Sequence, residues 1–162
     1  MSPELMGIHH LKFAVQDLDR AEAFYTAALG ATRIRDADHI DDNGHLYAII
    51  LDVPGLGTLL ELRLNPAAAL QQAGFDPVTI AVSDLAQLDA WCAKLDAVNI
   101  RRSPILTGIR AWLVVFEDPD RRRIRLYTLQ QHGPEVPPSV GDPWLSEDAA
   151  PADTRRDGTT AQ

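Results

Sequence analysis

Cysteine, long apolar runs and surplus positive charge are all scarce in this sequence, and each shortage excludes a class of protein. A single cysteine, Cys92, cannot form an internal disulfide or a cysteine-rich metal site. The longest apolar runs, 47–51 and 111–116, are the length of strands, far below the roughly 18 residues of a membrane-spanning helix. A net charge of −8 disfavours general nucleic-acid binding, which needs a surplus of Lys and Arg. We therefore expect no membrane and no nucleic-acid partner. Because the N-terminus has no secretory signal pattern, we expect a cytoplasmic location.

The remaining composition is that of one globular domain followed by a different C-terminal segment. Hydrophobic residues make up 46% and charged residues 23% of the chain, as in an ordinary globular domain. Residues 133–162 instead hold six acids, two bases and five of the eleven prolines, with Trp144 as the only aromatic residue. Such a segment buries too little apolar surface to offset the entropy lost on ordering. We predict a disordered, acidic, proline-rich tail over 131–162, with a functional tail that docks a partner through Trp144 and Leu145 as the alternative.

The first 130 residues contain two copies of one sequence module. HLKFAVQDL (10–18) aligns with PVTIAVSDL (77–85) at an offset of 67 residues, and LLELRL (59–64) aligns with RIRLYT (123–128) at an offset of 64. A repeat of this kind indicates the architecture, because each copy is expected to fold as the same supersecondary unit. The predicted units are a first module at 1–64, a linker at 65–74, a second module at 75–130 and the tail at 131–162.

Each copy has the pattern of a strand, a helix and three further strands. Apolar and polar residues alternate along the first segment, which indicates a strand with one buried face. The next segment spaces its apolar residues as a helix does, and Asp17 or Asp84 stands at its start in the N-cap position. The fold class is therefore α+β, with two tandem βαβββ modules. The three later strands of each copy are expected at about 32–36, 45–53, 57–64, 100–103, 109–117 and 122–129.

This tandem repeat, with an aromatic residue in each helix (Phe24 and Trp91) and a DPD turn at 118–120, resembles the vicinal oxygen chelate superfamily. That superfamily includes glyoxalase, methylmalonyl-CoA epimerase, extradiol dioxygenases and bleomycin-resistance proteins, and the resemblance covers about 7–129. It implies a curled mixed sheet around a cleft, with the helices outside. It also implies a divalent metal held by the first and last strands of each module, and a homodimer. Because one fold carries many activities, the reaction must be argued from the site.

The metal positions implied by the resemblance are only half filled. His10 and Glu61 fall on the first-strand and last-strand ligand positions of the first module, whereas Pro77 and Arg125 fall on those of the second. Proline has no side-chain donor atom, and a guanidinium is a permanent cation that cannot ligate a metal. Two protein ligands fall short of the three or more that hold a catalytic metal. We therefore expect no metal cofactor and interpret His10 and Glu61 as remnants, with a divalent metal completed by water, substrate or another chain as the alternative.

Strand alternation predicts a polar sheet face that could bind a ligand. Four fixed cations on this face are opposed by one carboxylate, Glu61, which favours an anionic ligand held by Arg side chains. Arg123 directly follows two other arginines after a turn, so we expect it to reach solvent. Tyr47 and Trp112 are candidates for lining an apolar pocket. The residues predicted on the polar face are His10, Lys12, Glu61, Arg63, Thr79, Arg123, Arg125 and Tyr127.

Three functions are compatible with these residues. The missing metal ligands favour a metal-free protein that binds a small anionic or aromatic molecule, as the bleomycin-resistance proteins it resembles bind their drug. The retained pair is compatible with a metal-dependent lyase, isomerase or dioxygenase using His10 and Glu61. A metal-free enzyme, with Glu61 as general base and Arg125 stabilising an oxyanion, is the third possibility, and an enzyme of glyoxalase type would be a lyase or isomerase. We expect Arg125 and Glu61 to pair between the modules, and we treat His45 as an outside acid–base candidate and Cys92 as a core thiol.

Overall fold

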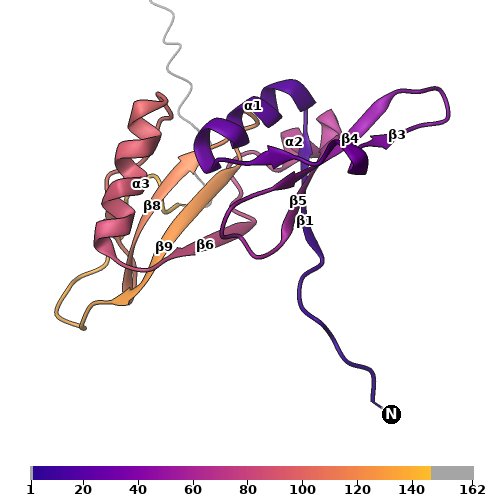
Figure 1. Cartoon of the computed structure of the whole chain (residues 1–162). Coiled ribbons are helices and arrows are strands. Elements are labelled where there is room, and N and C mark those ends of the chain that lie inside the picture. Colours follow the sequence, from indigo (N-terminus) through magenta and orange to yellow (C-terminus); the bar gives the residue numbers. More distant parts are fainter. Residues whose placement is uncertain (1, 147–162) are drawn as a thin grey trace, which may run out of the picture.

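Two βαβββ modules are present in the computed structural model, which describes residues 2–146. The α+β class and the tandem arrangement are confirmed, and each module carries its own sheet (Figure 1). The first module contains β1 (His10–Val15), α1 (Leu18–Leu29), β2 (Thr32–Arg33), a 3-10 turn (Arg35–Ala37), β3 (His39–Ile40), β4 (Leu46–Asp52) and β5 (Leu59–Leu64). The linker contains α2 (Pro66–Gln71), and the second module contains β6 (Val78–Val82), α3 (Leu85–Ala97), β7 (Leu106–Thr107), β8 (Ala111–Glu117) and β9 (Arg123–Gln131).

The strand order repeats between the two sheets. The first sheet runs β1-β5-β4-β2, with β3 also paired to β4, and the second runs β6-β9-β8-β7. In each module the first and last strands are parallel neighbours, because the helix and the intervening strands supply the crossover that a parallel pair requires. This register places Lys12 opposite Glu61 in the first sheet and Thr79 opposite Arg125 in the second.

Local sequence signals position the helices as predicted. Asp17 precedes α1 and its side chain accepts a hydrogen bond from the Arg20 backbone N–H, while Asp84 caps α3 through the Gln87 N–H. Both bonds satisfy a donor that has no partner inside the helix. Gly30 ends α1 with φ of 73°, a left-handed conformation that glycine adopts without a steric penalty.

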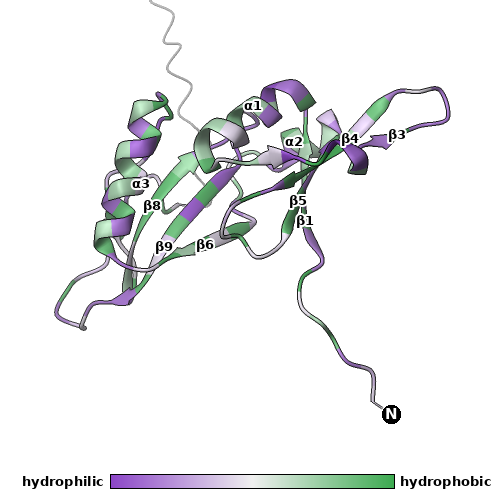
Figure 2. Ribbon diagram, viewed as in Figure 1, coloured by the Kyte–Doolittle hydropathy of each residue, from purple (hydrophilic) through white to green (hydrophobic). Residues whose placement is uncertain are grey.

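One hydrophobic core joins the modules. Helix α1 packs on β4 and β5, and α3 packs on β8 and β9 (Figure 1). Apolar side chains alternate with hydrophilic ones along β9 (Figure 2), so Ile124 and Leu126 face the core. The Phe24 ring of α1 lies 6.3 Å from the Phe116 ring of β8, which carries the core across the boundary between the modules. No helix within residues 2–146 is long and apolar enough to cross a membrane.

A buried polar cluster also ties the two modules together at the DPD turn. Arg122 is fully buried, pairs with Asp118 and donates to the Ala14 carbonyl of β1. The Tyr25 hydroxyl of α1 donates to the Asp118 carboxylate at 2.8 Å. Burial raises the pKa of Asp118, although the charge of Arg122 and the hydrogen bond from Tyr25 act in the opposite direction. In the same turn, Asp120 forms an ion pair with Arg20 of α1 at 3.0 Å.

Three element boundaries differ from the sequence prediction. The strand expected at 32–36 ends after Arg33 and continues as a 3-10 turn. Residues 100–103 make only one isolated bridge, at Arg102, because Pro104 cannot donate to a ladder; the edge strand forms later as β7. The linker is partly helical, since Asn65 caps α2 and Pro66 occupies its first turn, where proline fits best.

The predicted disorder of the C-terminal segment differs from the structure over residues 131–146. Gln131 belongs to β9, and Trp144 and Leu145 pack against the second sheet. Arg123 donates hydrogen bonds to the backbone oxygens of Trp144 and Ser146. An acidic, proline-rich composition does not predict disorder correctly here, because two apolar side chains and a few backbone contacts hold the segment on an available sheet face. The rest of the predicted tail, 147–162, lies outside the described residues.

Candidate functional site

Glu61 is the centre of a polar cluster on the first sheet, on the face opposite α1. Its neighbours Leu60 and Leu62 belong to the core, so alternation directs Glu61 to the other face. Although only 2% exposed, its carboxylate contacts three basic side chains: Arg63 Nε lies 2.7 Å from Oε1, and His10 Nε2 and Lys12 Nζ lie 3.1 and 3.6 Å from Oε2. The sequence prediction placed these four residues on one face, and the structure brings them together.

The charge state of Glu61 follows from these contacts. Burial by itself would raise the pKa of this carboxyl, but the Arg63 hydrogen bond and the charges of Arg63 and Lys12 outweigh it and hold the pKa below its ordinary value of 4.5. Glu61 is therefore ionised at neutral pH. A carboxylate with a lowered pKa is a weaker base, so this environment suits charge pairing better than proton abstraction.

An aromatic and imidazole layer borders the cluster on the side of β4. Tyr47 lies beneath Arg63, with the guanidinium carbon 5.2 Å from the ring centre, and the His39 ring lies 5.6 Å from that of Tyr47. Within residues 2–146, His39 Nδ1 is buried without a hydrogen-bond partner. His39 was not among the site residues predicted from the sequence. The turn at Asp41 to Gly44 pairs β3 with β4 and brings His39 opposite Ala48, and this turn was the signal available in the sequence.

The predicted pair between Glu61 and Arg125 is wrong. Arg125 forms its ion pair with Asp76, just before β6, and within the part of the chain that the structure describes no ion pair joins it to Glu61. The reason is that each charge has an opposite charge close by in its own module. Asp76 precedes the strand that pairs with β9, while Arg63 and Lys12 lie next to Glu61 within the first sheet. Each charge is therefore neutralised inside its own module.

The other predicted residues of the second module lie away from Glu61. Thr79 is exposed on β6 opposite Arg125, and Tyr127 packs with Trp144 on the second sheet. Arg123 was expected in solvent but is buried beneath the C-terminal segment, because backbone oxygens there replace water as its acceptors.

Three further residues lie outside both polar clusters. The Trp112 ring lies 5.1 Å from that of His132 and also contacts the core. His45 is exposed and pairs with Asp41 at 3.3 Å. Cys92 is buried in the core, and burial raises the pKa of its thiol. A thiol with a raised pKa is a poor nucleophile, which agrees with a structural role for Cys92.

The donor set does not fit a metal ion. Within residues 2–146, no group of three or more His, Cys, Asp or Glu side chains lies close enough together to hold one. Both nitrogens of His10 have contacts, since Nδ1 lies 2.9 Å from His9 Nδ1 and Nε2 faces Glu61. A divalent ion at Glu61 would also meet the fixed charges of Lys12 and Arg63. The residues present therefore favour an anion over a cation at this position.

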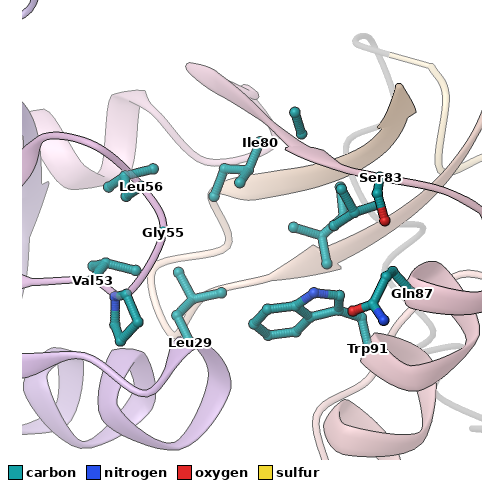
Figure 3. A pocket seen from close by; sticks show the side chains of 12 residues that line it. Leu29, Val53, Gly55, Leu56, Ile80, Ser83, Gln87 and Trp91 are labelled. Carbon is teal, nitrogen blue, oxygen red and sulfur yellow. The ribbon is translucent and has the colours of Figure 1, made fainter. Parts of the chain in front are cut away.

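An apolar cavity lies at the junction of the modules, and its lining residues do not include Tyr47 or Trp112, the residues expected from the sequence to line an apolar pocket. It has a volume of about 280 Å³ and includes neither Glu61 nor Arg125 among its lining residues. Figure 3 shows Leu29 and Leu56 of the first module facing Ile80 and Trp91 of the second. Gln87 is one of the few polar groups at its rim. Trp91, predicted only as the helix aromatic, is also covered by Lys94, whose Nζ lies 4.4 Å from the ring centre.

Fold and sequence together assign the chain to a superfamily. The family model described as Glyoxalase/Bleomycin resistance protein/Dioxygenase superfamily matches residues 7–126, and the chain belongs to this superfamily. Among curated proteins, none matches the chain significantly.

Solved structures of the same fold are distant in sequence. A mutant of the fosfomycin resistance protein FosX from Listeria monocytogenes, complexed with Mn(II) and 1S,2S-dihydroxypropylphosphonic acid, has a TM-score of 0.61 at 17% identity, covering 76% of this chain and 93% of FosX. Lactoylglutathione lyase from Agrobacterium tumefaciens has a TM-score of 0.58 at 16% identity, covering 78% and 96%. TnmS3, an antibiotic binding protein from Streptomyces sp. CB03234, has a TM-score of 0.56 at 21% identity, covering 77% and 98%. At these identities the likeness shows the fold.

Proposed function

We propose that this protein binds a small organic anion, preferably one with an aromatic ring, at the Glu61 cluster and without a resident metal. The observation that carries the proposal is the excess of basic side chains over acidic ones around one buried carboxylate. Glu61 is 2% exposed, whereas the side chains of His10, Arg63 and Lys12 are 33%, 36% and 50% exposed. The basic groups therefore remain accessible to a ligand while their common partner does not.

The geometry of Arg63 supports an anionic ligand in particular. Its Nε donates to Glu61, and a guanidinium has four further N–H donors on its terminal nitrogens, which can hold a carboxylate or phosphonate bidentately. Tyr47 beneath the guanidinium offers a flat apolar surface to a ring next to the anionic group. Lys12 adds a second fixed charge, so the cluster keeps a net positive charge after Glu61 is neutralised.

Binding is preferred over the two enzymatic alternatives for chemical reasons. The lowered pKa of Glu61 makes it a poor general base, and Arg125 has its own carboxylate partner in the second module. A metal-dependent lyase, isomerase or dioxygenase would need ligands beyond His10 and Glu61, and the second module offers Pro77 and Arg125 at the equivalent positions. Relatives that bind an antibiotic or a phosphonic acid indicate which ligand classes to test first.

Isothermal titration calorimetry with phenylphosphonate tests this proposal, because the probe joins a ring to a dianion. We expect saturable binding, weakened about tenfold, or about 1.4 kcal/mol, by Arg63→Gln and by Lys12→Gln. Arg110→Gln, which removes an exposed arginine outside the cluster, is the matched control and should leave affinity unchanged. Equal binding by all variants would refute the assignment to the Glu61 cluster. Tight one-to-one binding of Mn(II) or Zn(II), lost in His10→Ala, would replace it with the metalloenzyme alternative.

The proposal also includes a homodimer and the cytoplasmic location predicted from the sequence. A two-fold pair of identical chains is the commonest symmetric assembly of a soluble domain. Sedimentation velocity should show about twice the chain mass. A monomer at micromolar concentration would contradict the dimer without affecting the ligand assignment.

A further inference from the structure

The second sheet carries a face equivalent to the Glu61 face, and the chain covers that face itself. The covering segment is 139–146, here called the strap. Its Trp144 and Leu145 pack on Leu113 and Val115, which lie on the side of β8 opposite α3. Ser139 holds the start of the strap, since its N–H donates to the Thr107 carbonyl at 2.8 Å and its hydroxyl accepts from the Thr107 N–H at 3.0 Å.

The surroundings of Trp144 have the chemistry of a site for an aromatic carboxylate. The guanidinium carbons of Arg101 and Arg123 lie 5.0 and 6.0 Å from the centre of the indole ring, within range of cation–π attraction. Arg123 Nη1 donates to the Ser146 carbonyl at 2.5 Å and to the Trp144 carbonyl at 3.3 Å. The strap therefore already supplies the two parts of such a ligand. Its indole ring lies on the apolar face, and its carbonyl oxygens accept hydrogen bonds from the buried Arg123.

We propose that Trp144 is a displaceable internal occupant of this face, and that the face binds planar aromatic carboxylates when the strap leaves. A ligand of this class can replace the contacts that Trp144 and the strap make with the face and with Arg123, because its ring takes the place of the indole and its carboxylate takes the place of the carbonyl oxygens of Trp144 and Ser146 on Arg123. The carboxylate is the stronger acceptor for a guanidinium, which gives the ligand its advantage.

The strap is attached weakly enough to be displaced. Residues 139–146 form no helix or strand, and Trp144 is only partly buried although Leu113 and Val115 beneath it are fully buried. The neighbouring acid, Glu117, lies 3.6 Å from Arg123 Nε, whereas the strap oxygens accept from Arg123 Nη1, so the acid and the strap contact different nitrogens of the guanidinium. A tethered occupant acts at a high effective concentration, so a free ligand shows only part of its intrinsic affinity while the strap is closed.

Titration of the full-length chain with indole-3-propionate tests this proposal. Calorimetry should show binding at least about tenfold tighter in Trp144→Ala than in the wild type, because the indole no longer competes with the ligand ring for the face. Arg123→Gln in the Trp144→Ala background should abolish that gain, whereas Arg110→Gln in the same background should keep it. Unchanged affinity in a folded Trp144→Ala protein would show that Trp144 is ordinary core packing.

The wild-type protein gives a second measurement that does not depend on a variant folding. The chain has three tryptophans, and Trp91 on α3 and Trp112 contact the core on the other face of the second sheet. In an NMR spectrum of the 15N-labelled protein, millimolar indole-3-propionate should shift the indole N–H signal of Trp144 towards that of a solvent-exposed tryptophan. The signals of Trp91 and Trp112 should stay in place. Equal shifts of all three signals, or none, would overturn the proposal. Loss of binding in Arg63→Gln would instead place the probe at the Glu61 cluster, so the two proposals fail separately.

Discussion

Replacing Arg122 by methionine tests whether the buried cluster at the DPD turn holds the two modules together. Arg122 is 0% exposed and contacts both modules, because it pairs with Asp118 and donates to the Ala14 carbonyl and to Gln72 Oε1. Its guanidinium also lies 4.6 Å from the centre of the Phe13 ring. Methionine fills part of the same space but donates no hydrogen bond. The variant therefore leaves the carboxylate of Asp118 buried without its cation.

We expect a loss of about 3–5 kcal/mol in the free energy of unfolding at pH 7, the usual cost of removing one partner of a buried ion pair. The tyrosine bond to Asp118 remains, which argues against a larger loss. Urea denaturation followed by circular dichroism measures the change, and Arg121→Met, one residue earlier and exposed, is the matched control. The double variant Asp118→Asn with Arg122→Met should recover part of the loss, since no unpaired buried charge remains and the amide oxygen can still accept from the Tyr25 hydroxyl or the Asp120 and Arg122 backbone N–H groups.

The pH dependence of the Arg122→Met deficit has a definite sign. The folded-state pKa of Asp118 is already raised by burial, and removing the cation raises it further. A group whose pKa is higher in the folded state favours folding when protonated and opposes it when ionised, so the deficit should shrink as pH falls through that raised pKa. A loss below about 1 kcal/mol at pH 7, or a double variant as unstable as the single one, would refute this account of the cluster.

Two further predictions concern Glu61 and the C-terminal segment. The pKa of Glu61 is lowered on folding, so its ionised form contributes stability above its ordinary value of 4.5, and this contribution is lost as pH falls through the lower folded-state pKa. Acid titration should therefore show the stability difference between wild type and Glu61→Gln narrowing below pH 4.5; a difference independent of pH would contradict the pairing with Arg63 and Lys12. Deleting 133–162 should lower the melting temperature by several degrees, roughly 2–4 °C per kcal/mol of lost packing from Trp144 and Leu145, and an unchanged melting temperature by calorimetry would show that the strap adds no stability.

Local patterns in the sequence were sufficient for the modular fold. Alternating residues predicted β1 and β5, Asp17 and Asp84 predicted the starts of α1 and α3, and the internal offset showed that the two halves repeat. These features depend on neighbours a few residues away, which the sequence displays directly. The same alternation put His10, Lys12, Glu61 and Arg63 on one face, because side chains on paired strands project together.

Only the tertiary structure decided which charges are partners and which surfaces are covered. Arg125 pairs with Asp76 rather than Glu61, Arg122 reaches from one module into the other, and Trp144 lies on the second sheet. Each of these contacts depends on strand register, burial and the distance between segments far apart in the chain. An ionised side chain pairs with the nearest opposite charge that the fold supplies, and an apolar side chain covers whichever apolar face is within reach. Sequence periodicity gives neither the distance from a charge to its nearest opposite charge nor the distance from an apolar side chain to an apolar face.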